Sequence, residues 1–384
     1  MNEMKTVREP LFHITRRGIP LVWWKNWLIR VAAFFCALLL IGIGVLLLFK
    51  INPFSLYATM FEGAFIGSNY LVPTLKTAAK LLCLAVALAP AFKMRFWNIG
   101  AEGQMLIGAV VAAYFMHDFP ALPNGLLLLL MAVGAMAAGA VWGLIPAIFK
   151  AKFGTNETLF TLMMNYVAIN IVNYFVSIWK GDKVFIGVLN SNFRDAATYE
   201  KGYFRHIWKG HNGAWYANED LWYIVIIVIV AAVVYYYLKK TKQGYEIAVV
   251  GDSQNTARYA GISVSKVIIR TMLISGLICG LCGFLTVSSQ THTISTNITG
   301  GYGFTAIIVA WMSQFNTLTM AGISVLIVAL ENGSKHVFDA FYSTTGFPES
   351  AAAIIVGIFM LFIVGSEFFI NYKLNFRNSG KEAK

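Results

Sequence analysis

The sequence is short of charged side chains. Asp, Glu, Lys and Arg make up 12% of its 384 residues, whereas hydrophobic residues make up 58%; a typical soluble domain carries about 25% charged residues. Several stretches of about twenty residues contain no charge at all, which is the length an α-helix needs to cross the hydrocarbon core of a bilayer. A soluble globular protein is therefore excluded, and a helical protein that crosses a membrane many times is predicted.

Cysteine is scarce as well. Cys36, Cys83, Cys279 and Cys282 all fall in apolar stretches, so they cannot form the disulfide framework of a secreted protein. Cys279 and Cys282 have the spacing of a redox or metal motif, but Gly and Leu surround them, and this favours small-residue helix packing. No metal site is expected.

Nucleotide-binding and catalytic motifs are missing. The string G-x-x-x-x-G-K-[ST], whose backbone cradles the phosphates of ATP, occurs nowhere. The six histidines are scattered, and none stands with an acid at the spacing of metal ligands. We therefore expect the chain not to be an enzyme and to carry no cofactor, so that any ATP is bound by partner subunits.

Long apolar segments are what the sequence does contain. Windows of about nineteen residues mark candidate spans, and two of them, the third and the eighth, are short and flanked by Gly. The predicted fold class is an all-α polytopic membrane protein with about ten transmembrane helices. The ten spans are 30–49, 72–92, 104–117, 125–149, 158–179, 221–238, 267–289, 303–315, 317–334 and 350–370.

The basic residues orient these spans, because cytoplasmic segments concentrate Lys and Arg. The first thirty residues hold six of them, whereas the predicted outer loops 51–71, 117–124 and 290–302 hold none. The net charge of +12 lies in short clusters, which favours membrane orientation over nucleic-acid binding. The predicted organisation is a cytoplasmic segment 1–29, a membrane domain 30–370 and a cytoplasmic tail 371–384.

Two features fit this charge map less simply. The loop 180–220 carries six basic residues mixed with five acids, and we place it outside because both flanking spans agree with that orientation. Lys76 and Lys80 lie near the outer end of the second span. We expect both amines to snorkel to the membrane surface, where they remain in water.

Two segments about 200 residues apart are alike. One begins at Asn98 and the other at Asn297, and each continues as Asn-Ile, a Gly-rich turn and an apolar run. On the predicted topology they enter the membrane from opposite sides, so spans 2–5 and 7–10 are predicted to be inverted repeats. Such Gly-interrupted helices point to a transporter's central pathway, because a helix that starts in mid-membrane exposes backbone groups to a polar solute.

Polar side chains gather at these turns. Asn98 and Glu102 either cap the free N–H groups of the third span or line a solute path. Asn156 opens the fifth span and Asn165 follows within it. The fourteen residues from Asn156 to Asn170 are close to four helical turns, which predicts one polar face, and interhelical hydrogen bonding explains this face as well as solute contact does. The candidate pathway residues are Asn98, Glu102, Gln104, Asn156, Asn165 and Thr305.

The string NIGAEGQ followed by an apolar helix resembles the permease subunits of ATP-binding-cassette (ABC) importers, in the nucleoside branch of the group that also handles simple sugars and branched-chain amino acids. The resemblance covers about residues 70–370 and includes Gly154–Tyr166 and Gly301–Ala310. It implies a bacterial plasma-membrane protein with both termini in the cytoplasm. It also implies three kinds of partner: a second permease, homologous or identical; cytoplasmic ATP-binding subunits; and an extracellular solute-binding lipoprotein.

The segment 239–266 is the predicted cytoplasmic coupling loop. Asn255 to Tyr259 are predicted to form a short helix that Gly261 ends. Taken alone, an ordinary solvated connection is an equal alternative, but the loop resembles the family's coupling segment. The residues that the resemblance assigns to ATPase contact are Glu246, Gly251, Asn255, Ala257, Tyr259 and Gly261.

The prediction is therefore one membrane-spanning half of an importer that works by alternating access. The solute, nucleosides, rests on the resemblance alone, and a simple sugar of the ribose or galactose type is the alternative. An ion-coupled secondary transporter is the other competitor. It would need a carboxylate deep in the bundle, whereas Glu331 and Glu367 lie toward helix ends.

Overall fold

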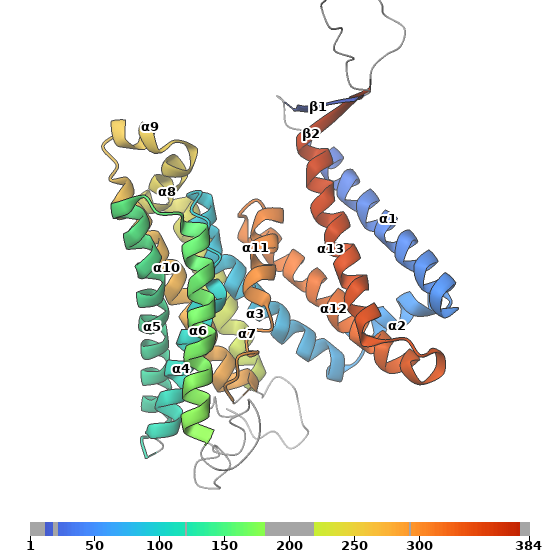
Figure 1. The fold of residues 1–384 in the computed structure, drawn as a ribbon, viewed down its shortest axis with the longest axis horizontal. Helices are drawn as coiled ribbons and strands as arrows, with labels where there is room; N and C mark the ends of the chain where they lie inside the picture. The colour runs from blue at the N-terminus through green and yellow to red at the C-terminus, as the bar shows by residue number, and fades with distance from the viewer. Residues whose placement is uncertain (1–11, 18–21, 120, 181–218, 292, 377–384) are drawn as a thin grey trace, which may run out of the picture. The chain divides into compact units, whose positions relative to one another are not determined.

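The computed structural model describes residues 12–17, 22–119, 121–180, 219–291 and 293–376 (Figure 1). Within them lie 13 α-helices, one π-helical turn and two short strands. Eight of the described helices are long and apolar enough to cross a membrane. The predicted all-α polytopic class is therefore confirmed. The predicted outer loop 180–220 lies almost entirely outside the described residues.

Each of the ten predicted spans falls on a helix, but two of these helices are not full spans by length and hydropathy. α4 (Ala101–Asp118) has polar residues at both ends, among them Glu102 and His117. α11 (Tyr302–Met312) has only 11 residues. A count of ten is not confirmed within the described part of the chain, and the inverted repeat remains a prediction.

The chain divides into two compact units. Residues 64–329 form the larger unit, and residues 1–63 with 330–384 form the smaller one. One boundary falls near the end of α2 (Pro53–Phe65) and the other within α12 (Thr317–Thr345). The other helices of the larger unit are α3 (Ser68–Lys93), α4, α5 (Asn124–Phe153), α6 (Glu157–Lys180), α7 (Glu219–Lys240), α8 (Lys242–Asp252), α9 (Gln254–Tyr259), α10 (Val264–Leu285) with the π-helical turn η3 (Thr286–Thr291), and α11.

Helix α10 is the centre of the larger unit, where it packs against α3, α4 and α5. Glycines bring these backbones into direct contact. A Cβ added at Gly139 of α5 or at Gly276 of α10 would overlap the carbonyl oxygen of the other, and one added at Gly108 of α4 would overlap Gly280. Small residues therefore let α4, α5 and α10 pack closely, as is common between membrane helices.

The CxxC spacing lies on the same helix. Cys279 and Cys282 are fully buried free thiols on α10, and Cys282 lies against α3, where Cys83 is buried as well. No group of three metal-binding side chains occurs in the described part of the chain.

The smaller unit contains α1 (Trp23–Phe49), α2 (Pro53–Phe65), the second part of α12 and α13 (Glu349–Asn371). α1 packs along α13, and the ion pair Arg30–Glu367, at 2.5 Å, joins them. Strand β1 (Phe12–Arg16) pairs antiparallel with β2 (Tyr372–Phe376). The segments that precede α1 and follow α13 therefore lie together. α2 was not predicted, because its 13 residues are too few for a membrane span and fall in the stretch 51–71 assigned to an outer loop.

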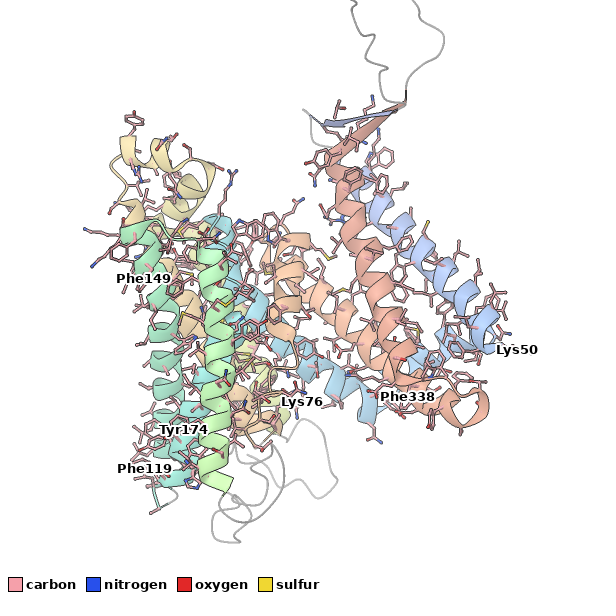
Figure 2. The ribbon with its side chains drawn as sticks, viewed as in Figure 1. Lys50, Lys76, Phe119, Phe149, Tyr174 and Phe338 are labelled. Atoms are coloured by element: carbon pink, nitrogen blue, oxygen red, sulfur yellow. The ribbon has the colours of Figure 1, made fainter. Side chains whose placement is uncertain are left out.

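Large apolar side chains cover the outer faces of the helices. In the larger unit, Phe119 after α4, Phe149 of α5 and Tyr174 of α6 (Figure 2) are 40%, 41% and 61% exposed. In water such a surface would drive aggregation. It is the surface expected of a protein whose solvent is lipid.

Candidate functional site

The first Gly-rich turn, between α3 and α4, is held by buried side-chain hydrogen bonds. Asn98 is fully buried. Its Oδ1 accepts a hydrogen bond from Gly100 N–H at 2.9 Å, and its Nδ2 donates to Ser275 Oγ of α10 at 3.2 Å. The amide of Gln104 lies 3.3–3.4 Å from that of Asn98. Asn98 and Gln104 therefore tie the turn to α10.

Helix α6 holds the same turn from the other side. Asn165 Oδ1 accepts a hydrogen bond from Gly103 N–H, and Asn165 Nδ2 donates to the carbonyl of Ile99, both at 2.9 Å. Thr161 Oγ1 accepts from Ile99 N–H at 3.1 Å. Gly103 lies in the first turn of α4, where N–H groups have no partner within the helix. Asn165 of α6 therefore supplies the partner of one of these N–H groups of α4.

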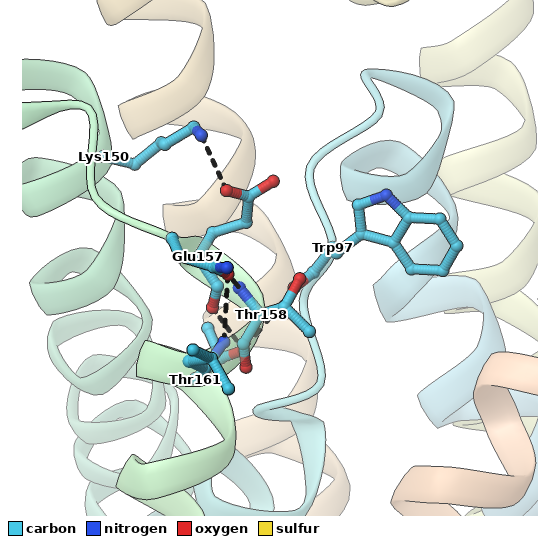
Figure 3. A network of polar contacts seen from close by, with 7 residues as sticks. Trp97, Lys150, Glu157, Thr158 and Thr161 are labelled. Carbon is cyan, nitrogen blue, oxygen red and sulfur yellow. Dashed lines mark hydrogen bonds and ion pairs between the residues drawn. The ribbon is translucent and has the colours of Figure 1, made fainter.

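The start of α6 is itself fixed by polar contacts (Figure 3). Asn156 Oδ1 accepts hydrogen bonds from Thr158 N–H at 3.0 Å and Leu159 N–H at 3.2 Å, which is the geometry of a helix N-cap. Glu157 forms a 2.7 Å ion pair with Lys150 of α5. Asn156 is exposed, so the structure separates it from the buried cluster around Asn98.

Glu102 does not cap its own helix. Its side chain crosses to the second Gly-rich turn, where Oε2 accepts a hydrogen bond from Gly303 N–H at 2.8 Å and Oε1 accepts one from the hydroxyl of Thr299. Gly303 lies in the first turn of α11, which begins after Gly301 in the left-handed region at φ 74°. A carboxylate there complements the partial positive charge of a helix N-terminus. The two matched turns are thus joined through one buried side chain.

Lys80 reaches the second turn from α3. The side chain is only 6% exposed, its Nζ donates to the carbonyl of Ile298 at 3.3 Å, and the cation lies 4.8 Å from the ring centroid of Tyr302. The expectation that Lys80 snorkels to the surface is wrong. Its amine finds a carbonyl and an aromatic face inside the unit, and these replace water as its partners.

The structure brings together four of the six predicted pathway residues. Asn98, Glu102, Gln104 and Asn165 are 0–6% exposed and share one cluster at the starts of α4 and α11. Thr305 is half-buried in the first turn and a half of α11, and Asn156 lies apart. Sequence reasoning missed Ser275, Thr161, Thr299 and Lys80. Polar residues inside apolar spans were the available signal for Ser275, Thr161 and Lys80, whereas Thr299 lies in the predicted outer loop 290–302.

Two indoles lie beside this cluster. Trp97, in the first turn, and Trp311, near the end of α11, stack at a centroid distance of 5.2 Å and an interplanar angle of 21°. Phe92 and Phe315 pack against them. Both indoles are more than 40% exposed, so this pair presents an aromatic face at the edge of the polar cluster.

The short helix predicted at Asn255–Tyr259 is present. α9 covers Gln254–Tyr259, Ser253 Oγ accepts a hydrogen bond from Thr256 N–H at 3.2 Å, and Gly261 follows with φ 78°. Tyr259 is 94% exposed and Ala257 is fully buried. The helix therefore has an anchored face and a free face, and Asn255 is on the exposed side.

Helix α8 connects α9 to the membrane helices and was not predicted. Glu246 forms a 2.9 Å ion pair with Arg270 of α10. A Cβ at Gly251 would overlap the carbonyl oxygen of Lys93, at the end of α3. The chain from Lys93 then leads directly into the turn that holds Asn98. Contacts between backbones thus run from α9 through α8 to the first Gly-rich turn.

Residues 70–364 match the family described as branched-chain amino acid transport system, permease component. The chain belongs to this permease family. One relative of the permease is the guanosine ABC transporter permease protein of Bacillus subtilis, with 29% identity over 81% of this chain and 85% of the relative. The glucose ABC transporter permease protein of Haloferax volcanii is 29% identical over 90% of each chain, and the nucleoside ABC transporter permease protein of Lactococcus lactis is 26% identical over 84% and 87%.

Proposed function

We propose that this permease is the membrane-spanning subunit of an ABC importer that brings nucleosides into a bacterial cell. The family match carries the transport function. The solute class is supported by relatives named for guanosine and for nucleosides, each matching most of this chain. A chain without a nucleotide-binding motif needs ATP-binding subunits as partners. A second permease and an extracellular solute-binding lipoprotein complete the proposed importer.

Both termini are proposed to lie in the cytoplasm, as the basic residues predict. The pairing of β1 with β2 supports their lying on one side. The proposed arrangement keeps 1–29 and 371–384 in the cytoplasm, 30–370 as the membrane domain, 180–220 outside and 239–266 as the coupling loop. In this orientation the exposed face of α9 meets the ATPase.

The transport step is proposed to be alternating access at the two joined turns. A movement of α9 would displace α8, and the contact of Gly251 with Lys93 would transmit this displacement to the first turn. The hydrogen bond from Gly303 N–H to Glu102 would transmit it further to α11. The buried amides of Asn98, Gln104 and Asn165 have partners in the cluster. If ATP binding breaks some of these hydrogen bonds, the freed amide groups can form hydrogen bonds with the solute.

The solute proposal is tested by uptake into proteoliposomes that contain the complete transporter. Labelled guanosine or another nucleoside should accumulate only with ATP, and excess unlabelled nucleoside, but not glucose or ribose, should block it. The glucose relative makes a simple sugar the alternative. ATP-dependent sugar accumulation with no nucleoside accumulation would refute the nucleoside assignment, and accumulation by this chain alone on an ion gradient would refute the ABC assignment.

The coupling proposal is tested at the exposed face of α9. Tyr259→Ala removes a side chain that is 94% exposed and therefore contributes little to the packing of the described residues. We expect normal folding, retained ATP hydrolysis and a loss of ATP-driven uptake. Tyr245→Ala, at an exposed position of α8 (67% exposed), is the matched control. Wild-type uptake per ATP hydrolysed in Tyr259→Ala would remove α9 from the coupling path.

A further inference from the structure

A hollow of about 730 Å³ lies between α1 and α13 in the smaller unit. Apolar side chains of both helices form most of its wall, including Leu28 and Phe369. Arg17, Tyr372 and Lys373 line one end, beyond the ends of the two helices. None of the residues that line it is acidic. The hollow is therefore apolar along its length and positively charged at one end.

The cations at this end are not neutralised by the nearby acid. Glu367, one turn before the end of α13, is paired with Arg30 at 2.5 Å. Two hydrogen bonds to the segment at the end of α13 and the start of β2 hold Arg17 in place. The side-chain Nε donates to the carbonyl of Tyr372 at 3.3 Å, and the backbone N–H donates to the carbonyl of Asn371 at 3.0 Å. A guanidinium has five N–H donors, and the bond to Tyr372 uses one of them.

We propose that this hollow, called here the α1–α13 groove, binds an anionic phospholipid from the surrounding bilayer. The phosphate lies at Arg17 and Lys373, and an acyl chain lies against the apolar wall. Basic pockets between transmembrane helices bind anionic lipid head groups, and two cations together favour an anionic over a zwitterionic lipid by about thirtyfold. The proposal does not depend on the transported solute.

Gly365 provides a way to close the groove without disturbing the helices. It lies on α13 and lines the groove, and a Cβ added there meets no atom within 4 Å. A leucine at this position would extend into the space that the acyl chain occupies. Gly357 lies two turns earlier on the same helix, also has open space around a Cβ, and is not among the residues that line the groove. Gly357→Leu is therefore a matched control.

Native mass spectrometry of the purified transporter complex tests the proposal, with defined phosphatidylglycerol and phosphatidylcholine added to the detergent. The wild type should retain phosphatidylglycerol in preference to phosphatidylcholine. Gly365→Leu should lose that retained lipid, whereas Gly357→Leu should keep it. The double variant Arg17→Gln/Lys373→Gln should lose the preference, by about thirtyfold in relative retention, while still binding phosphatidylcholine.

Two results would overturn the proposal. The first is equal retention of phosphatidylglycerol by Gly365→Leu and Gly357→Leu, which would place the lipid elsewhere. The second is a preference for phosphatidylglycerol in Arg17→Gln/Lys373→Gln that equals the wild-type preference. This double variant keeps the apolar wall intact, so it remains informative if Gly365→Leu assembles poorly. Uptake is not the readout, so failure here would leave the proposed transport function untouched.

Discussion

Glu102 joins the two Gly-rich turns, and its removal has a calculable effect. Glu102→Ala leaves Gly303 N–H and the Thr299 hydroxyl buried without this acceptor. Two unsatisfied buried donors cost about 1–3 kcal/mol each, which sums to about 2–6 kcal/mol. Hydrogen bonds between membrane helices average about 0.6 kcal/mol, because the unfolded chain in the membrane also finds partners. We therefore expect Glu102→Ala to lower the free energy of unfolding by an amount near the lower end of this range, about 2 kcal/mol.

Unfolding of the purified protein by SDS titration in mixed micelles measures this loss. The control is Glu349→Ala, since Glu349 also stands in the first turn of a span helix but is exposed, and surface changes stay within about 0.5 kcal/mol. Thr299→Val removes one of the two donors and should cost about 1 kcal/mol. The double variant Glu102→Ala/Thr299→Val should be less destabilised than the sum by at least about 0.5 kcal/mol, because one orphaned donor is gone.

The same variants report on transport. If the two turns move as a coupled pair, Glu102→Ala should lower ATP-driven uptake in proteoliposomes more than it lowers the amount of folded complex. Glu102→Gln keeps the shape and one acceptor, so it should retain more activity than Glu102→Ala. Unchanged stability and unchanged uptake in Glu102→Ala would refute both the energetic reasoning and the role of this side chain as a link.

Three further predictions follow from neighbouring contacts. Asn165→Ala removes the partners of Gly103 N–H and the Ile99 carbonyl and should destabilise by about 2 kcal/mol or more in the same titration, whereas Asn170→Ala, exposed and bonded only within its helix, should not. Lys80→Met keeps the apolar stem but loses the hydrogen bond to the carbonyl of Ile298 in the second turn, so uptake should fall. Its control is Lys335→Met, which removes the i,i+4 ion pair with Glu331, worth about 0.5 kcal/mol or less. Gly251→Ala forces α8 away from Lys93 and should reduce uptake per ATP hydrolysed; wild-type values would exclude this contact from coupling.

Hydropathy was sufficient to locate every long helix, because a span must supply about twenty apolar residues whatever its neighbours are. The short helices were harder. α9 was predicted from its flanking Gly261, whereas α8 was missed since Gly244 and Gly251 weaken its helical pattern. Those glycines are required by the close approach of Tyr237 and Lys93, and such contacts cannot be read from one segment alone.

Four polar residues of the site were predicted from the sequence, but the contacts that they make were not. Asn98 and Glu102 were expected to cap α4. Asn165 instead accepts the hydrogen bond from Gly103 N–H of α4, and Glu102 accepts one from Gly303 N–H of α11. Lys80 was assigned to the surface because its bonding carbonyl, at Ile298, lies 218 residues away. Periodicity within a helix identifies a polar face, whereas the choice between two polar neighbours depends on tertiary packing.

The bond between Glu102 and Thr299 also bears on biosynthesis. The two residues are 197 positions apart, so a ribosome that adds about 5–20 residues per second needs about 10–40 s to make the second after the first. During that interval α4 stands in the membrane with a carboxylate that lacks its final donors. A chain that ends before α11 would keep the Glu102 carboxylate without these hydrogen-bond donors. Cellular quality control could therefore distinguish a truncated permease from a complete one at this single side chain.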